Sequence, residues 1–134
     1  MKLSSKTIMA IKMFIDLGEQ YENGFISLKD IAQRKDLSKK FLEQIVPSYK
    51  NAGLLLGNRG NQGGYKLAKS PNQISLKDIV YLQENNLAKE QIGFAPIDNA
   101  IEEADELLDS YFGKITLAKL IEDQQESYLN DYSI

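Results

Sequence analysis

The stretch from residue 58 to residue 67, NRGNQGGYKL, places three glycines beside an arginine and is the first candidate for chemistry. A phosphate-binding loop needs G-x-x-x-x-G-K-S/T between a strand and a helix, and a dinucleotide loop needs G-x-G-x-x-G in the same setting. Here Gly60, Gly63 and Gly64 lie between two short apolar runs, and no helix follows to supply a positive N-terminus. The pattern therefore favours the turn of a β-hairpin over a nucleotide site.

The side chains most used in catalysis and metal binding are missing, because the sequence has no cysteine and no histidine. This excludes disulfides, thiolate redox chemistry, imidazole catalysis and the usual zinc and iron–sulfur ligands. Carboxylate metal sites are the remaining alternative. We therefore expect a protein that is not an enzyme and that carries neither cofactor nor metal.

A second candidate lies in residues 38–52, where polar side chains share one face of a predicted helix. Lys40, Glu43 and Gln44 follow three- and four-residue steps, and an apolar stripe occupies the other face. In a major groove, Gln44 can pair with adenine, Glu43 can accept from the cytosine amino group, and lysines can meet phosphate or guanine. An ordinary solvated helix face is the alternative interpretation of the same residues.

Pro47 falls on this polar face as well. A proline in a helix interior costs about 3 kcal/mol, because it removes a backbone hydrogen bond and its ring clashes with the preceding turn. The sequence therefore predicts that the regular helix bends near Val46, which leaves its N-terminal turns as the useful part.

Apolar spacing and capping residues predict the elements that position these side chains. The letters SLKDI occur at 27–31 and again at 75–79, and both copies resemble capping boxes, with Ser27 paired to Asp30 and Ser75 paired to Asp78. The predicted helices cover 6–20, 28–35, 39–52, 76–84, 98–112 and 117–127, and the last residues are expected to fray. A helix, a second helix, a polar-faced helix and a hairpin, in that order, are typical of a winged helix-turn-helix.

The long helix predicted at 98–112 is strongly acidic and carries a coiled-coil-like apolar seam. The seam is longer than a small core needs, so we expect self-association, with packing against its own domain as the alternative. Its residues are Ile97, Ile101, Ala104, Leu107, Leu108, Tyr111 and Phe112.

The charge differs between the two halves of the 134-residue chain, although the total is only −3. Residues 1–70 hold 12 Lys/Arg and 6 Asp/Glu, a net of +6, whereas residues 71–134 hold 4 and 13, a net of −9. This asymmetry indicates a nucleic-acid-facing N-terminal half, with random clustering on a solvated surface as the alternative. Lys12 and Asp16 interrupt the first apolar stretch and no apolar run could span a membrane, so we expect a cytoplasmic protein without a signal peptide.

Five segments together resemble the Rrf-two family of bacterial transcriptional regulators, which includes iron–sulfur assembly (IscR-like) regulators and cysteine-metabolism repressors. They are KLSSK at 2–6, ISLKDIAQRKDLSKKFLEQI at 26–45, AGLL at 52–55, NRGNQGGYKLA at 58–68 and ISLKDIV at 74–80. The similarity runs over essentially the whole chain. It identifies the protein as a member of a family of dimeric winged-helix repressors and activators.

The resemblance implies a homodimer on double-stranded DNA, with the recognition helix in the major groove and the wing in the minor groove. It assigns residues 1–84 to the DNA-binding domain, 85–97 to a linker matching the cluster-binding loop of relatives, and 98–134 to the dimerisation helix and the C-terminal helix. The expected DNA-binding residues are Ser5, Lys6, Ser27, Lys29, Ser38, Lys39, Lys40, Glu43, Gln44, Lys50, Arg59, Asn61, Gln62 and Gly63.

The chain departs from the family's iron–sulfur sensors in one segment. Those sensors carry three cysteines between the fourth and fifth helices, whereas the matching segment here, ENNLAKEQIGFAP, has none. We therefore expect a repressor of the cluster-free branch, some of whose members respond to a metabolite or a partner enzyme. A winged-helix protein-interaction module without specific DNA binding is the alternative function.

Overall fold

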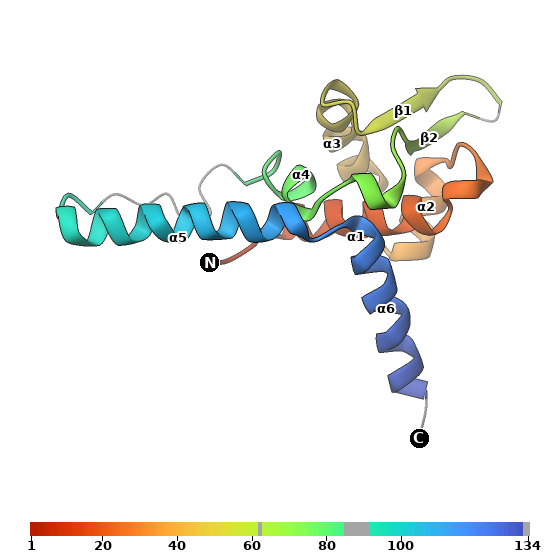
Figure 1. Cartoon of the computed structure of the whole chain (residues 1–134). Coiled ribbons are helices and arrows are strands. Elements are labelled where there is room, and N and C mark those ends of the chain that lie inside the picture. The colour runs from red at the N-terminus through yellow and green to blue at the C-terminus, as the bar shows by residue number, and fades with distance from the viewer. Residues whose placement is uncertain (62, 85–91, 133–134) are drawn as a thin grey trace.

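The structure is a computed structural model, and it describes residues 1–61, 63–84 and 92–132. Its elements are α1 (Ser5–Glu19), η1 (Tyr21–Asn23), α2 (Leu28–Lys35), α3 (Lys39–Asn51), β1 (Leu55–Asn58), β2 (Gly64–Leu67), η2 (Pro71–Gln73), α4 (Leu76–Val80), α5 (Ala95–Lys114) and α6 (Leu117–Tyr132). Helices α1 to α4 and the hairpin form a compact body, from which α5 and α6 project in different directions (Figure 1). The predicted architecture, mainly α-helical with one small hairpin, is confirmed.

The core is built around α1 and the apolar face of α3. Phe14 of α1 and Tyr49 of α3 are fully buried and meet edge to face, with their ring centroids 4.8 Å apart. The Tyr49 hydroxyl donates a 2.7 Å hydrogen bond to the carbonyl of Ile79 in α4, and burial raises the pKa of Tyr49 to about 12. One side chain therefore ties α3 to both α1 and α4.

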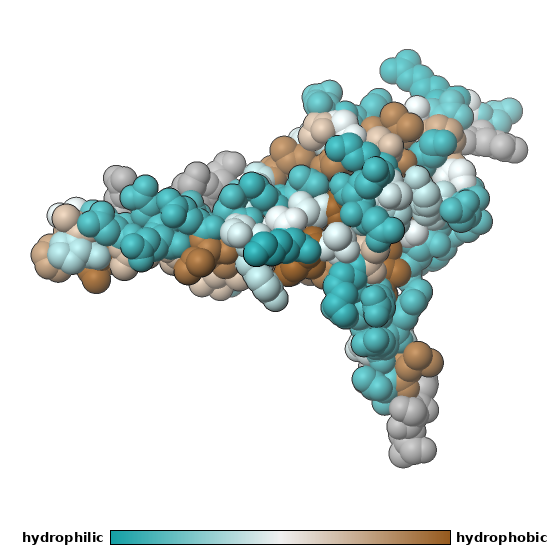
Figure 2. All heavy atoms as spheres, in the orientation of Figure 1, coloured by the Kyte–Doolittle hydropathy of each residue, from teal (hydrophilic) through white to brown (hydrophobic). Residues whose placement is uncertain are grey.

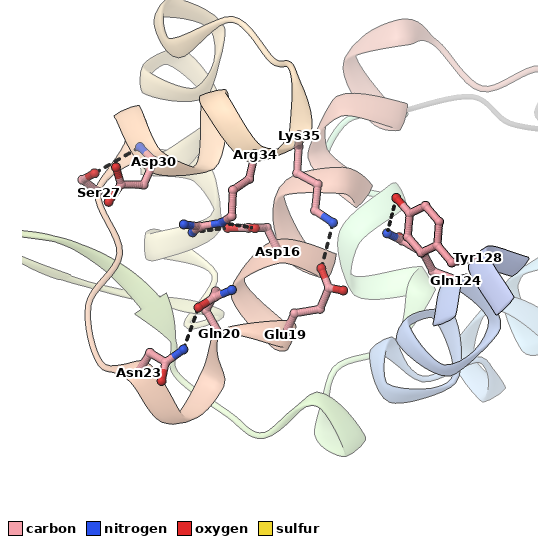
Figure 3. Close-up of polar contacts among 10 residues, drawn as sticks. All are labelled: Asp16, Glu19, Gln20, Asn23, Ser27, Asp30, Arg34, Lys35, Gln124 and Tyr128. Carbon is pink, nitrogen blue, oxygen red and sulfur yellow. Dashed lines mark hydrogen bonds and ion pairs between the residues drawn. The ribbon is translucent and has the colours of Figure 1, made fainter. Parts of the chain in front are cut away.

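Two ion pairs hold α2 against α1 (Figure 3). Arg34 donates to both carboxylate oxygens of Asp16, from Nε at 2.8 Å and from Nη2 at 3.0 Å. Lys35 donates to Glu19 at 2.7 Å. Asp16 lies in the core, with its side chain only 1% exposed, so its charge is compensated almost entirely by Arg34.

The hairpin is anchored to the helical body by a third extended segment. Strands β1 and β2 are antiparallel, with Leu55 opposite Leu67, and Ile26 and Tyr65 exchange two 2.8 Å backbone hydrogen bonds beside them. Gly64 makes this approach close, because a Cβ at that position would collide with the carbonyl of Ile26. The wing is therefore fixed relative to α2, which begins directly after Ile26.

Several predicted boundaries differ from the structure. Helix α4 ends at Val80 rather than at 84, α5 begins at Ala95 inside the predicted linker, and α6 continues to Tyr132, where fraying was expected. Both capping residues accept from the third residue of their helices, but the reciprocal carboxylate bond is recorded only at Ser75. The assignment of residues 85–91 to the linker lies outside the described residues.

Helix α3 continues through Pro47 to Asn51, so Pro47 does not end the helix, and the bend expected near Val46 stays a prediction. Pro47 is exposed, so water can hydrate the Glu43 carbonyl that lacks its N–H partner. Val46 and Tyr49 on the opposite face are buried and hold the turn in place. The exposed face of α3 therefore extends over the whole helix, from Lys39 to Asn51.

Helix α5 contacts the body mainly at its C-terminal end, through α4. Phe112 is only 6% exposed there and lies 6.4 Å from the ring of Tyr81, between centroids. Phe112, one of the predicted dimerisation residues, therefore already packs within its own protomer. Within the described part of the chain, no helix is both long and apolar enough to cross a lipid bilayer.

Candidate nucleic-acid interface

The N-terminal half of α3 presents an exposed polar face. Ser38 caps the helix by accepting a 3.2 Å hydrogen bond from the Phe41 backbone N–H. Lys39 and Lys40 follow immediately, and both are exposed. The helix dipole and these two ammonium groups make the start of α3 positive, which suits contact with phosphate.

Glu43 and Gln44 lie one turn further along the same face and are also exposed. Glu43 forms an ion pair with Lys39 at 3.9 Å, and both side chains are more than half exposed. Such a pair contributes little free energy in water, so Glu43 can exchange Lys39 for another donor. The buried side of the same helix, including Leu42 and Ile45, keeps this polar face pointing outward.

The hairpin supplies a second exposed surface, a short wing. Gly63 closes its tip by donating to the Gly60 carbonyl at 2.9 Å, and Arg59 and Asn61 beside it are exposed. Gln62, another predicted contact, lies outside the described residues. A narrow tip that carries one guanidinium matches what a minor groove about 6 Å wide admits.

Lysine side chains flank the wing on two sides. The Lys50 ammonium, near the end of α3, lies close to Gly57 of β1, which places a cation between the recognition helix and the wing. Lys66 of β2 lies 4.8 Å from the centroid of the Phe25 ring. Lys66 was missed by the sequence analysis, although the alternation in GYKL places it on the face opposite the buried Leu67.

The remaining predicted contacts are distributed over two helix starts. Ser27 caps α2 by accepting from the Asp30 N–H at 3.1 Å, and Lys29 is exposed in the first turn of that helix. Ser5 and Lys6 are exposed in the first turn of α1, beside the Ser4 N–H that donates to Glu84 at 2.7 Å. The fold therefore gathers α3, the wing and Lys50, whereas Ser5 and Lys6 lie near the end of α4.

Comparison with known proteins identifies the family to which the chain belongs. The sequence profile of Rrf2, described as "Iron-dependent Transcriptional regulator", matches residues 3–123, which is most of the chain. The chain belongs to the Rrf2 family. Rrf2 and Rrf-two are the same family, so the resemblance seen in the sequence is confirmed. The family consists of transcriptional regulators rather than enzymes.

Individual relatives agree with this assignment. The HTH-type transcriptional regulator CymR of Bacillus subtilis is 37% identical over 92 residues, which cover 69% of this chain and 67% of that protein. A putative HTH-type transcriptional regulator of Synechocystis is 38% identical over 87 residues, 65% of this chain and 59% of that protein, so less than two thirds of its length is matched. A putative regulator of Neisseria meningitidis is 30% identical over 131 residues, covering 91% and 88% of the two chains.

Solved structures of Rrf2 proteins share the fold. The structure of T. potens IscR superposes with a TM-score of 0.80 at 32% identity, covering 95% of this chain and 90% of that one. The structure of CymR (YrzC), titled the global cysteine regulator of B. subtilis, gives a TM-score of 0.75 at 32% identity, with 91% and 97% covered. The arrangement of recognition helix and wing is therefore that of known winged-helix regulators.

The iron in the family's description does not fit the residues of this chain. A thiolate-ligated cluster requires cysteines, and the sequence has none. Among residues 1–61, 63–84 and 92–132, no group of three or more His, Cys, Asp or Glu side chains could hold a metal ion.

Helix α5 carries a row of apolar side chains that its own protomer leaves uncovered. Leu107 is 72% exposed and Tyr111 62%, and Ile97 and Ala104 are exposed as well. Figure 2 shows hydrophobic side chains along the lower edge of this projecting helix, among hydrophilic ones. Ile101 and Leu108 are half-buried, so the row on α5 is exposed mainly at Ile97, Ala104, Leu107 and Tyr111.

Proposed function

We propose that this Rrf2 protein is a sequence-specific DNA-binding repressor that acts as a homodimer in the cytoplasm. The observation that carries the proposal is the exposed polar start of α3 beside a wing held rigidly by the Ile26–Tyr65 bridge. The recognition helix enters the major groove, and the wing enters the adjacent minor groove.

Each part of this surface has a distinct role in the proposal. Lys39, Lys40 and Lys50 contact phosphates and supply affinity, whereas Glu43 and Gln44 contact base edges and supply selectivity. Arg59 at the wing tip occupies the minor groove, where a narrow groove concentrates negative potential. These roles are supported by exposure and charge on one side of the body.

Dimerisation through α5 provides the second recognition helix. The exposed stripe around Leu107 and Tyr111 is too long to remain in water on a small monomer, and a second copy of α5 covers it most simply. Sedimentation velocity of the Leu107→Glu variant tests this: we expect a monomer, whereas the Glu106→Gln control, on an exposed acidic position of the same helix, remains dimeric. A monomeric wild-type protein at micromolar concentration contradicts the proposal.

DNA binding is tested by fluorescence anisotropy with the chain's own upstream region against a random duplex of equal length. Specific binding is expected to weaken steeply with salt, because each neutralised phosphate contributes a slope of about −0.9 in log K against log salt. The Arg59→Ala variant is expected to bind about tenfold more weakly with an unchanged melting temperature. The Lys119→Ala control removes an equally exposed cation of α6 and should leave the affinity unchanged.

Selectivity is tested separately with Glu43→Ala in a site-selection experiment. Loss of the carboxylate is expected to relax the base preference at one position while the affinity for the best site changes little. Equal affinity of the wild-type protein for the upstream region and for random DNA favours a protein-interaction module instead. In vitro transcription from the bound promoter distinguishes repression from activation.

A further inference from the structure

A cavity of about 290 Å³ lies between the C-terminal end of α3 and α4, at the opposite end of α3 from Ser38. Its volume is at the lower limit of small-molecule sites. Leu54, which follows α3, and Leu82, in the turn after α4, supply apolar walls, and Leu82 is 41% exposed. The cavity therefore offers a short apolar surface to a small ligand.

Two lysines give this cavity a positive rim. Lys69 is exposed and forms no ion pair or hydrogen bond with another side chain in the described part of the protein. Lys77 donates to Asp109 of α5 at 2.9 Å, but both side chains are more than 40% exposed, so this pair contributes little in water. The acidic wall residue, Asp78, already accepts from the Ser75 N–H at 3.0 Å as the cap of α4. Asp78 keeps its negative charge in this bond, so two ammonium groups and one carboxylate give the lining a net charge of +1.

A third feature of the wall is an unused hydroxyl. The Tyr81 oxygen is buried and has no hydrogen-bond partner within the described residues. A buried hydroxyl without a partner is unfavourable and uncommon in folded proteins. Because that oxygen is buried, it is not presented to a ligand, and the cavity offers an apolar wall and two ammonium groups with weak or no partners.

We propose that this cavity binds a small organic carboxylate with a short apolar portion. The carboxylate lies between Lys69 and Lys77, and the apolar portion packs against Leu54 and Leu82. On binding, Lys77 leaves Asp109 for the ligand, because a carboxylate with two ammonium partners competes well with one exposed ion pair. This inference goes beyond the proposed DNA binding and does not depend on it.

The position of the cavity connects two parts of the molecule. Ala52, the C-cap of α3, lies in its wall, and the Lys77–Asp109 pair is a direct link between α4 and α5. A carboxylate in the cavity therefore contacts the end of the polar-faced helix and removes one attachment of the projecting helix.

The proposal is tested by titrating the full chain with butyrate and following backbone amide signals by two-dimensional NMR. Butylammonium and butanol serve as matched probes with the opposite charge and no charge. We expect saturable shifts around residues 52–54, 69 and 77–82 with butyrate only. Equal shifts with all three probes, or no saturation with butyrate, overturn the site.

Variants distinguish butyrate binding at this cavity from non-specific attraction of anions to exposed lysines. Lys69→Met and Lys77→Met are each expected to weaken butyrate binding about tenfold, whereas Lys119→Met, which breaks an exposed Lys–Asp pair on α6, leaves it unchanged. Asp109→Asn frees Lys77 and is expected to tighten binding about twofold to fivefold. Equal weakening by Lys119→Met overturns the site, and unchanged affinity in Asp109→Asn overturns the exchange of partners. Dispersed spectra of each variant confirm that it is folded.

Discussion

The ion pair between Asp16 and Arg34 gives a sharp test of what holds the helix-turn-helix against α1. The two side chains form two hydrogen bonds, yet they differ in burial: the Asp16 side chain is 1% exposed and the Arg34 side chain 40% (Figure 3). Removing either partner breaks the same contact but leaves a different residue without its partner. Which substitution lowers the free energy of unfolding more therefore depends on the burial of the remaining residue rather than on the contact itself.

Arg34→Met leaves a carboxylate in the core without its cation. Breaking a buried pair in this way typically destabilises by about 3–5 kcal/mol, because the remaining charge is neither hydrated nor compensated. Asp16→Asn instead leaves a guanidinium that water can reach, and the amide oxygen can still accept one hydrogen bond. Loss of the charge-assisted contact then costs about 1–2 kcal/mol. The expected difference between the two variants is about 2 kcal/mol.

Urea unfolding followed by circular dichroism measures both variants and the double variant, from which the coupling free energy follows. The Lys119→Met variant serves as the control, because its solvent-exposed pair with Asp123 should contribute little to the free energy of unfolding. Hydrogen bonding to Asp16 raises the pKa of Arg34 above its ordinary value. The contribution of the ion pair to the free energy of unfolding should therefore be the same from about pH 6 to pH 9. Equal losses in the two single variants, or a larger loss in Asp16→Asn, refute the reasoning.

Three further predictions concern the wing, the turn of the helix-turn-helix and the start of α1. Gly64→Ala collides with the Ile26 carbonyl, so urea unfolding should show a loss of about 2 kcal/mol as the two backbone hydrogen bonds of the Ile26–Tyr65 bridge are lost. Asp36 follows α2 with φ of 53°, so Asp36→Gly should be at least as stable as the wild type and Asp36→Ala about 1 kcal/mol less stable, as measured by urea unfolding. Hydrogen bonds, first from the Thr7 hydroxyl and then from the Ser4 N–H, lower the pKa of Glu84. The ionised Glu84 carboxylate therefore stabilises the folded protein fully above the unfolded pKa of about 4.3, and this stabilisation is lost as the pH falls through the lower pKa of the folded state. The decrease in melting temperature caused by Glu84→Gln should therefore be larger at pH 6 than at pH 3.

Local signals in the sequence were sufficient for most elements. Ser38 and Ser75 predicted the starts of α3 and α4, because a capping hydroxyl bonds to an N–H only three residues away. The glycines at 60, 63 and 64 predicted the hairpin tip from backbone requirements that are equally local. The polar face of α3 followed from helical spacing alone, and its exposure is confirmed.

Other features depended on contacts between distant segments. The continuation of α3 through Pro47 depends on buried neighbours such as Val46 and Tyr49. Periodicity placed Phe112 in the seam on α5 but does not show that its ring lies beside Tyr81. The length of α5 was underestimated at both ends. Its first turns contain Pro96, which is compatible with a helix start, but no capping side chain marks the boundary.

The sequence by itself determined the capped helix starts, the hairpin, the charge asymmetry and the family, because each depends on residue type or on spacing within a few positions. The tertiary structure alone decided which partner each buried polar group received. Asp16 was only a charge that interrupted an apolar run until folding placed Arg34, eighteen positions later, against it. Tyr49 was one member of an apolar stripe until packing brought its hydroxyl to the carbonyl of Ile79. Such pairings follow from the positions of whole helices, which no local pattern specifies.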